Sequence, residues 1–174
     1  NNYETLFGTS TLDLVQGKLG LKYNTSAGGV EAGIVGGYGE ISDGRIALIT
    51  ATDTDAKLEV TKMGAYGSYV MDALFSEPYL APYLEGQLYK YDWVESAKSG
   101  EEVKGDTQIS YGFSLGVLFQ LNWLDPSNAF IARESFGLNN TYVDLFVSYY
   151  TKGGGDDPDF TSNTNLGFGL KFEF

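Results

Sequence analysis

The sequence predicts an all-β fold, an eight-stranded antiparallel β-barrel. Three observations predict it. The C-terminal segment has apolar residues at every second position, and the charge-free stretch 107–124 repeats that alternation. Successive side chains of a strand point to opposite faces of the sheet, so both segments are expected to be strands. The chain also has 23 Gly, 13 Tyr and 11 Phe in 174 residues. Glycine at about twice its usual frequency, together with aromatic residues, suits a tightly curved sheet.

Each expected strand is a segment in which apolar residues alternate with polar or small ones. The stretch 107–124 is long enough for a membrane-spanning helix. As a helix it would spread Gln120, Asn122 and several Ser and Gly around its whole circumference, so a strand is favoured. A tight turn is expected at 42–44 and a short link at 75–78, whereas 94–106 and 152–163 predict long, flexible polar loops. The expected strands are 15–23, 30–41, 46–52, 57–71, 80–91, 107–123, 142–150 and 166–174.

One helix is expected within this β-structure, at 126–136, because Asp125 or Ser127 followed by helix-forming residues is a helix-start signature. Alternatively, 129–136 is a ninth strand and 5–12 a tenth. Eight strands are preferred to ten, because ten would place the long loop 94–106 on the same side as the C-terminus. Residues 1–14 are an N-terminal extension or the start of a long first strand. The whole chain, 1–174, is one expected domain.

The chemistry of the two strand faces decides which face meets water. The strongest strands oppose their large apolar residues with Gly, Ser, Gln and Asn, while charges concentrate in the connections. This favours an apolar face toward lipid and a narrow polar interior that side chains fill. The expected lumen-facing residues are Lys18, Lys22, Glu85, Gln87, Asp144, Lys171 and Glu173. Rings near strand ends are expected to form interfacial girdles, namely Tyr89, Trp93, Trp123, Tyr149, Tyr150, Phe172 and Phe174.

Three passages, 81–89, 109–123 and 165–174, resemble the small outer-membrane β-barrels of Gram-negative bacteria, the group containing the OmpA transmembrane domain and OmpX. The resemblance implies a monomer in the bacterial outer membrane, in contact with the bilayer and lipopolysaccharide. It also implies that the barrel-assembly machinery reads the terminal Phe174 as part of a targeting signal. The C-terminus and the helix at 126–136 would then be periplasmic and the long loops extracellular. The chain begins without a signal peptide and is expected to be the mature form, after removal of that signal.

Composition narrows the functions that remain. A net charge of -12 argues against nucleic acid as a partner. Without Cys, no disulfide or thiolate metal site is expected; without His, the base or relay used by the catalytic small barrels is missing, so no enzyme is expected. No cofactor is expected. Acidic loops offer weak Ca²⁺ candidates, for which solvated loops are the favoured interpretation. These candidates are Asp53, Asp55, Asp156, Asp157 and Asp159.

Two function classes are left by these exclusions. The first is a structural or surface-interaction barrel whose lumen is largely filled by side chains. The second is a narrow passive channel, or a carrier of small or apolar solutes across the outer membrane. A soluble lipid-binding barrel is a third, less favoured class. Period-two alternation alone does not separate an apolar interior from an apolar exterior. The preference for a membrane barrel over a soluble one therefore depends on the residue types of the two strand faces.

Overall fold

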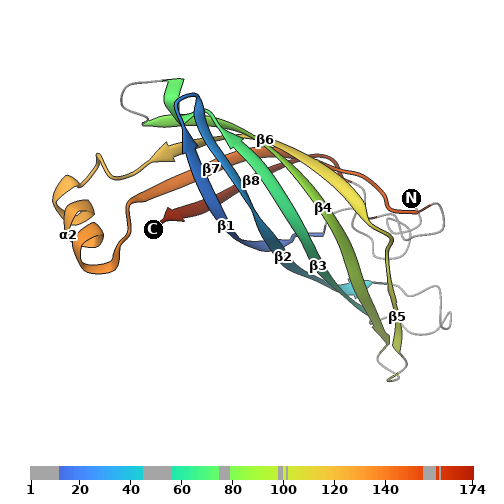
Figure 1. Cartoon of the computed structure of the whole chain (residues 1–174). Helices are drawn as coiled ribbons and strands as arrows, with labels where there is room; N and C mark the ends of the chain where they lie inside the picture. The colour runs from blue at the N-terminus through green and yellow to red at the C-terminus, as the bar shows by residue number, and fades with distance from the viewer. Residues whose placement is uncertain are drawn as a thin grey trace.

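The computed structural model describes residues 12–44, 56–74, 79–97, 100, 102–154, 160 and 162–174. These residues form one antiparallel sheet of eight strands that curls into a half-barrel, with a single α-helix beyond its end (Figure 1). The all-β fold expected from the alternation is confirmed. The elements in chain order are β1 (Val15–Thr25), β2 (Gly28–Gly44), β3 (Ala56–Val70), the 3₁₀ turn η1 (Asp72–Leu74), β4 (Leu80–Ala97), β5 (Glu102–Asp106), β6 (Ser110–Gln120), α2 (Pro126–Phe136), β7 (Asn140–Tyr150) and β8 (Ser162–Glu173).

The strands of the sheet follow the order β1-β2-β3-β4-β6-β7-β8, and β5 lies beside β4, off this path. Every neighbouring pair is antiparallel. One end of the sheet carries the end of β8, the helix α2, η1 and the turn between β1 and β2; we call it the C-terminal end. The opposite end carries the paired strands β4 and β5 of the hairpin, the end of β2, the start of β3, the end of β7 and the start of β8.

The tight turn expected at 42–44 is wrong. Strand β2 continues through these residues, where its ladder to β3 is shifted between the pairs Ser42↔Lys57 and Gly44↔Ala56. The tight turn lies instead between Thr25 and Gly28, whose φ of 140° suits glycine. There the Thr25 hydroxyl donates to the Gly28 carbonyl at 2.7 Å. The expected strand 46–52 and the link 75–78 lie outside the described residues.

The long flexible loop expected at 94–106 is also wrong. Strand β4 runs on to Ala97, and β5 returns along it in register from Glu102 opposite Ser96 to Asp106 opposite Asp92. The charged composition of 94–106 predicts a loop because charges in the rest of the sequence concentrate in the connections between strands. A hairpin in water accepts charge on its outer face, so composition alone did not distinguish the two.

The helix expected at 126–136 is confirmed as α2. Asp125 caps it by accepting from the Asn128 backbone N–H at 3.1 Å, and Pro126 occupies the first turn. Gly137, at φ 70°, ends the helix in the left-handed conformation, and its N–H donates to the Arg133 carbonyl at 3.0 Å. The alternative in which 129–136 is a ninth strand is therefore wrong. The alternative tenth strand at 5–12 lies outside the described residues, except for Leu12.

Candidate functional site: the outer band and the lumen

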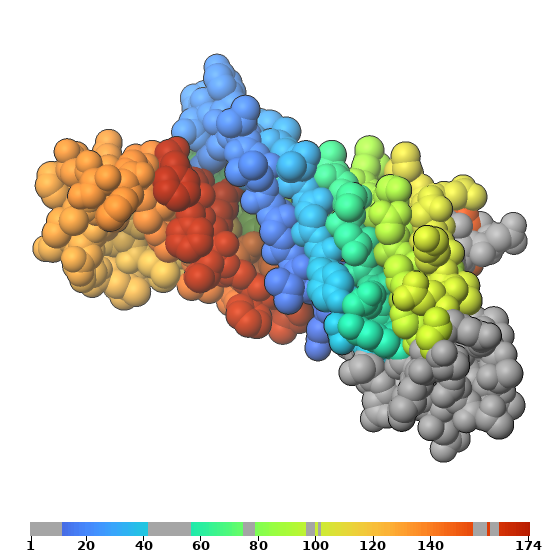
Figure 2. Space-filling model, turned by 90° about the horizontal axis from the view of Figure 1, so that it is seen from below, coloured from blue at the N-terminus to red at the C-terminus, as the bar shows by residue number. Residues whose placement is uncertain are grey.

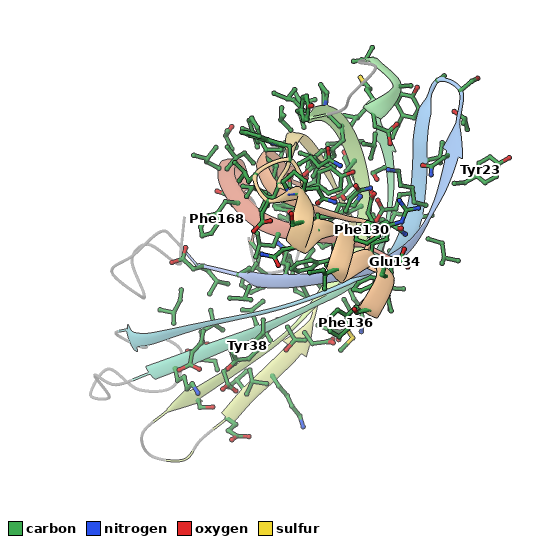
Figure 3. All side chains as sticks on the ribbon, turned by 90° about the vertical axis from the view of Figure 1, so that its left-hand side faces the viewer. Tyr23, Tyr38, Phe130, Glu134, Phe136 and Phe168 are labelled. Carbon is green, nitrogen blue, oxygen red and sulfur yellow. The ribbon has the colours of Figure 1, made fainter. Side chains whose placement is uncertain are left out.

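The outer face of the sheet carries a continuous belt of large apolar side chains, which we call the outer band. Leu21 on β1 and Phe168 on β8 are 86% and 85% exposed. Figure 3 shows Tyr23 and Phe168 pointing away from the interior of the curled sheet. The exposed apolar residues of the band are Val15, Leu19, Leu21, Tyr23, Val30, Ile34, Met63, Tyr69, Leu80, Leu84, Leu88, Tyr111, Phe113, Leu115, Phe119, Leu145, Val147, Tyr149, Leu166, Phe168, Leu170 and Phe172.

At the level of the outer band, the inner face of the sheet is polar. Glu85 and Gln87 on β4 are each 3% exposed, although both are among the most polar side chains of the strand. The Lys18 ammonium donates to Glu85 Oε1 at 2.5 Å, and the Gln87 amide donates to the same oxygen at 2.7 Å. A buried carboxylate is costly unless it is paired and hydrogen-bonded, and here both conditions are met.

Lys62 extends this network through Gln87. Its side chain is completely buried, and its ammonium donates to the side-chain oxygens of Gln87 at 2.7 Å and Gln16 at 3.1 Å. The same ammonium lies over the rings of Tyr150, 4.1 Å from the centroid, and Tyr89, at 4.5 Å. Two cation–π contacts and two hydrogen bonds hold the charge in place. Lys62 therefore occupies the interior of the curled sheet.

A second ionic network fills the lumen near the C-terminal end. The Lys22 ammonium lies 2.9 Å from Glu173 Oε1 and 2.8 Å from Asp72 Oδ2. Lys171 pairs with Glu31, which also accepts from the Tyr66 hydroxyl at 2.6 Å. Lysines and carboxylates of the two networks face each other along the lumen, so the interior charges compensate one another.

Aromatic rings fill the space between these polar groups, and several of them lie opposite a glycine on the neighbouring strand. Tyr83 is directly paired with Gly116, where an added Cβ would lie 2.5 Å from the ring. A glycine leaves room for the ring to lie flat across the next strand, which accounts for much of the glycine content. Six such pairs lie among the described residues: Tyr66–Gly33, Tyr83–Gly116, Tyr89–Gly64, Trp93–Gly105, Phe146–Gly167 and Tyr150–Gly112.

The polarity of the two faces inverts where β2, β3, β4 and β5 extend past the rest of the sheet. We call this part the extension. The last apolar row of the outer face pairs Ile34, Ala65 and Leu88, and two rows further the paired residues are Tyr38, Thr61 and Asp92. Beyond that row the outer face is charged, with Lys57 3.1 Å from Glu40 and 2.7 Å from Glu59.

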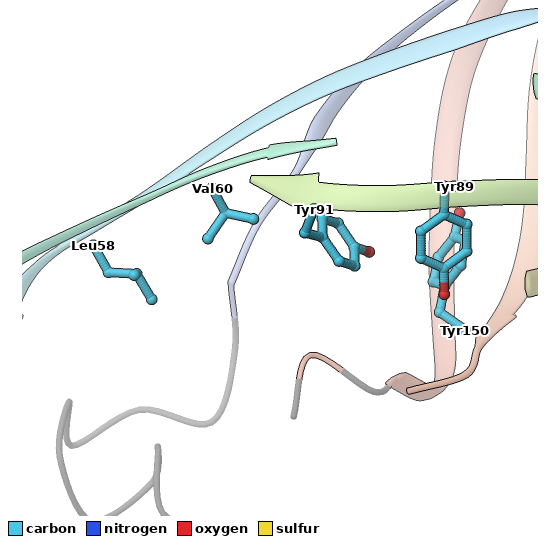
Figure 4. Packing of buried hydrophobic residues seen from close by; sticks show 5 residues of the cluster. All are labelled: Leu58, Val60, Tyr89, Tyr91 and Tyr150. Carbon is cyan, nitrogen blue, oxygen red and sulfur yellow. The ribbon is translucent and has the colours of Figure 1, made fainter. Parts of the chain in front are cut away.

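The inner face of the extension is mainly apolar instead of polar, although Glu95, which is paired with Leu58, is also buried on it. Leu58, Val60 and Tyr91 are buried there and pack with Tyr89 and Tyr150 (Figure 4). Leu12, Leu14, Ile41, Trp93 and Phe160 pack against this cluster. The extension thus has the polarity of a sheet in water, with charge outside and apolar residues inside. The outer band, a few residues away on the same strands, has the opposite polarity.

The seven residues expected in the lumen all lie on the inner face, and each takes part in the polar contacts of the lumen. Among the expected girdle residues, Trp123, Tyr149, Phe172 and Phe174 are exposed. The prediction that Tyr89, Trp93 and Tyr150 belong to the outer girdle is wrong. Tyr89 and Tyr150 are buried on the inner face, and Trp93 packs inward on Gly105. Proximity to a strand end does not set facing, whereas the parity of each position along its strand does.

Three charged lumen residues were missed by the sequence reasoning. Lys62 alternates with the outward Met63, so parity alone could have placed it inside. Glu31 lies in the glycine-rich strand β2, whose facing the sequence left unclear. Asp72 lies in η1, and only its ion pair with Lys22 brings it to the lumen. No local sequence pattern predicts the ion pair between Asp72 and Lys22.

The structure offers little support for other site types. The weak Ca²⁺ candidates Asp53, Asp55, Asp156, Asp157 and Asp159 lie outside the described residues. Within the described ranges, no group of three or more His, Cys, Asp or Glu residues is placed to hold a metal ion. Neither helix in the described part of the chain has the length and hydropathy needed to cross a membrane. In comparisons with known proteins, no protein-family model, curated protein or solved structure matches this chain.

Proposed function

We propose that this chain is an integral β-barrel of the bacterial outer membrane with a structural or surface-interaction role. The observation that carries the proposal is the inversion of polarity at the row Tyr38, Thr61 and Asp92. Before that row, Leu84 and Leu88 face outward over a polar interior; in the row and beyond it, Asp92 and Glu59 face outward over a mainly apolar one. A change of solvent around the sheet, from hydrocarbon to water, accounts for both halves.

The height of the outer band agrees with a bilayer. On β4 the band runs from Leu80 to Leu88, after which the outer face turns charged. Eight steps of about 3.3 Å, inclined at about 40°, rise roughly 20 Å, close to the apolar height of about 25 Å in outer-membrane barrels. The exposed Trp123 packs edge-on against Tyr79, 6.0 Å between ring centroids, near the C-terminal end. Such rings suit a membrane interface.

The filled lumen favours a structural role over conduction. Lys62, the ring–glycine pairs and the two ionic networks occupy the interior of the sheet. In this proposal the extension stands on the extracellular side, where its charged outer face meets water and lipopolysaccharide. The C-terminal end, with α2, is periplasmic. Phe174, exposed at the end of β8, is available to the assembly machinery as a targeting residue.

Spin labels at two levels of one strand test the membrane assignment. The chain has no Cys, so single cysteines at Leu88 and Asp92, both outward on β4, can be labelled selectively in reconstituted vesicles. We expect the Leu88 label to collide mainly with oxygen, which concentrates in lipid, and the Asp92 label with a water-soluble nickel chelate. Leu115→Cys serves as a second label within the band. Nickel collisions at all three positions would contradict the proposal.

Conductance separates the proposed role from the channel alternative. We expect the purified protein to add no stable unitary current to planar bilayers, because Lys62 and its partners fill the bore. A reproducible unitary current from the unmodified protein would instead favour a narrow passive channel. Outer-membrane fractionation with heat-modifiable gel migration tests the location itself.

A further inference from the structure

Glu95 is a carboxyl group buried on the inner face of the extension. It lies near the end of β4, paired with Leu58 of β3 on one side and with Val103 of β5 on the other. Glu95 is 5% exposed and Leu58 is 2% exposed. Figure 2 shows the strands of the extension side by side, with β2 in cyan, β3 in green, and β4 and β5 in green to yellow. The carboxyl therefore belongs to the interior of this part of the sheet, with a strand on each side.

This carboxyl has no hydrogen bond or ion pair within the described part of the chain, and burial is the one cause that shifts its pKa. The buried carboxylate of the lumen differs, because Glu85 is paired with Lys18. The indole Nε1 of Trp93, two residues before Glu95 on the same face, is also buried without a partner. A buried carboxyl group without a partner is far more stable neutral than charged.

The charged side chains of the two flanking strands do not face Glu95. Successive side chains of a strand point to opposite faces, so the residues on either side of Leu58 and of Val103 lie on the outer face. On β3 these are Lys57 and Glu59, which form an ion pair with each other at 2.7 Å. On β5 they are Glu102 and Lys104, both exposed.

Other titratable groups around the apolar cluster are also directed elsewhere. Lys62 is paired with Tyr91, four residues from Glu95 along β4, and its ammonium is held on the lumen side by two glutamines. The buried Tyr91 phenol is neutral below about pH 10. Asp13, in the segment that packs on the cluster, is exposed. Desolvation therefore raises the pKa of Glu95 above the ordinary 4.5, with no nearby charge to oppose it.

Ionised Glu95 reaches water only if this part of the sheet opens. Because side chains alternate between the two faces, the carboxylate does not reach the outer face while the registers with Leu58 and Val103 hold. The hairpin is held by β5, a strand of only five residues, Glu102–Asp106. Short strands at the end of a sheet open locally at lower cost than its centre. The end of the β4–β5 hairpin is thus the part that yields.

We propose that Glu95 is a proton-binding site that controls access to the inner face of the extension. With the carboxyl protonated, the end of the hairpin stays in the sheet; loss of the proton releases it and exposes Leu58 and Trp93 to water. The proton's stabilising effect is complete below the ordinary pKa of 4.5 and is lost as pH rises through the raised pKa. This site concerns the extension alone, so it is independent of whether the outer band faces lipid.

Trp93 reports the state of the extension, because the chain has only two tryptophans. Trp123→Phe leaves Trp93 as the sole indole, and its quenching by acrylamide is followed in detergent micelles from about pH 4 to about pH 9, a range that covers buried glutamates. We expect the quenching constant to rise severalfold with pH. With Glu95→Gln added, which removes the charge at nearly constant shape, Trp93 should stay protected throughout. Glu102→Gln, on the exposed face of β5, is the matched control and should keep the rise.

Three results would overturn the inference: an equal rise in Glu95→Gln, a quenching constant that falls as pH increases, or a constant value across the range in the Trp123→Phe parent. Far-ultraviolet circular dichroism at each pH shows whether the whole sheet remains folded. Quenching that rises only together with loss of the β-sheet signal would also reject the proton site, because the event would then be global unfolding. Since the measurement is made in micelles, its outcome is separate from that of the spin-label test.

Discussion

The pairing of inward rings with cross-strand glycines predicts that Gly116→Ala destabilises the protein although alanine is the smallest possible addition. The new Cβ would lie 2.5, 2.7 and 2.8 Å from Cε1, Cζ and Oη of Tyr83, whereas ordinary contacts are 3.4–4 Å. Tyr83 is 4% exposed, so its ring has little room to move. A shift of the ring also strains the hydrogen bond from its hydroxyl to Asp144, now 3.0 Å.

The expected loss follows from three contributions. Overpacking a filled interior costs about 1–3 kcal/mol, and leaving the Tyr83–Asp144 pair unmade costs about 1–2 kcal/mol. Replacing glycine in a strand returns about 0.5–1 kcal/mol of backbone entropy. We therefore expect the free energy of unfolding to fall by about 1–4 kcal/mol. Urea unfolding of the folded protein in micelles, followed by tryptophan emission, measures it.

Gly86→Ala is the matched control, because Gly86 faces outward on β4 and its added Cβ would meet only Phe113, at 4.0 Å. It is expected to leave stability unchanged or slightly higher. In a Tyr83→Ala background, Gly116→Ala should lose most of its cost, because the obstructing ring is gone. Equal effects of Gly116→Ala and Gly86→Ala, or an undiminished cost without the ring, would refute the ring–glycine account.

The remaining predictions concern the outer band, the lumen and the helix. Leu115→Lys should lower stability in vesicles by about 2–4 kcal/mol, as charge does on a lipid-facing strand, whereas Val94→Lys in the extension should have little effect; similar small effects in both unfolding experiments would argue against lipid contact. Glu85→Leu should cost about 1–3 kcal/mol because the partly exposed Lys18 loses its partner and the buried Gln87 amide loses an acceptor, while Asp92→Asn, which breaks an exposed pair with Lys90, should cost under about 1 kcal/mol. Hydrogen bonds from the Asn128 backbone and side chain lower the pKa of Asp125. Its contribution to the helix start is therefore complete above the ordinary pKa of 3.8 and lost as pH falls through the lower folded value. The protection of the Asn128 amide against exchange, relative to its intrinsic rate at each pH, should fall in acid, and Asp125→Asn should abolish that pH dependence; an unchanged acid response in Asp125→Asn would show that another group is responsible.

Strand facing was predictable wherever the period of two was unbroken. Lys18, Gln87 and Lys171 were expected inside from alternation with apolar residues, and the structure places them there. The expected girdle at Tyr89 and Trp93 was wrong because it relied on nearness to a strand end. An aromatic residue at a given position is an outward anchor or an inward filler according to parity and to the residue across from it. Gly64 and Gly105 make these two rings inward fillers.

Strand ends were harder to predict than strand cores. The residues 42–44 have a turn composition, yet they are held in β2 by pairing with β3, which tertiary contact decides. The charged composition of the β4–β5 hairpin predicts a loop, whereas the structure pairs it as strands with charge on the outer face. Strands of two opposite polarities occur in the same sheet, and a single expected polarity does not fit both.

The sequence by itself determined the all-β class, the facing of the main strands and the capped helix at 126–136, because alternation and capping depend on residues that are neighbours in the chain. The tertiary structure alone decided which charges meet, which rings lie over which glycines, and where the polarity of the sheet inverts. Lys22 and Glu173 are 151 residues apart and become partners only when the sheet curls. Such contacts depend on register and curvature summed over many strands, which no local pattern encodes.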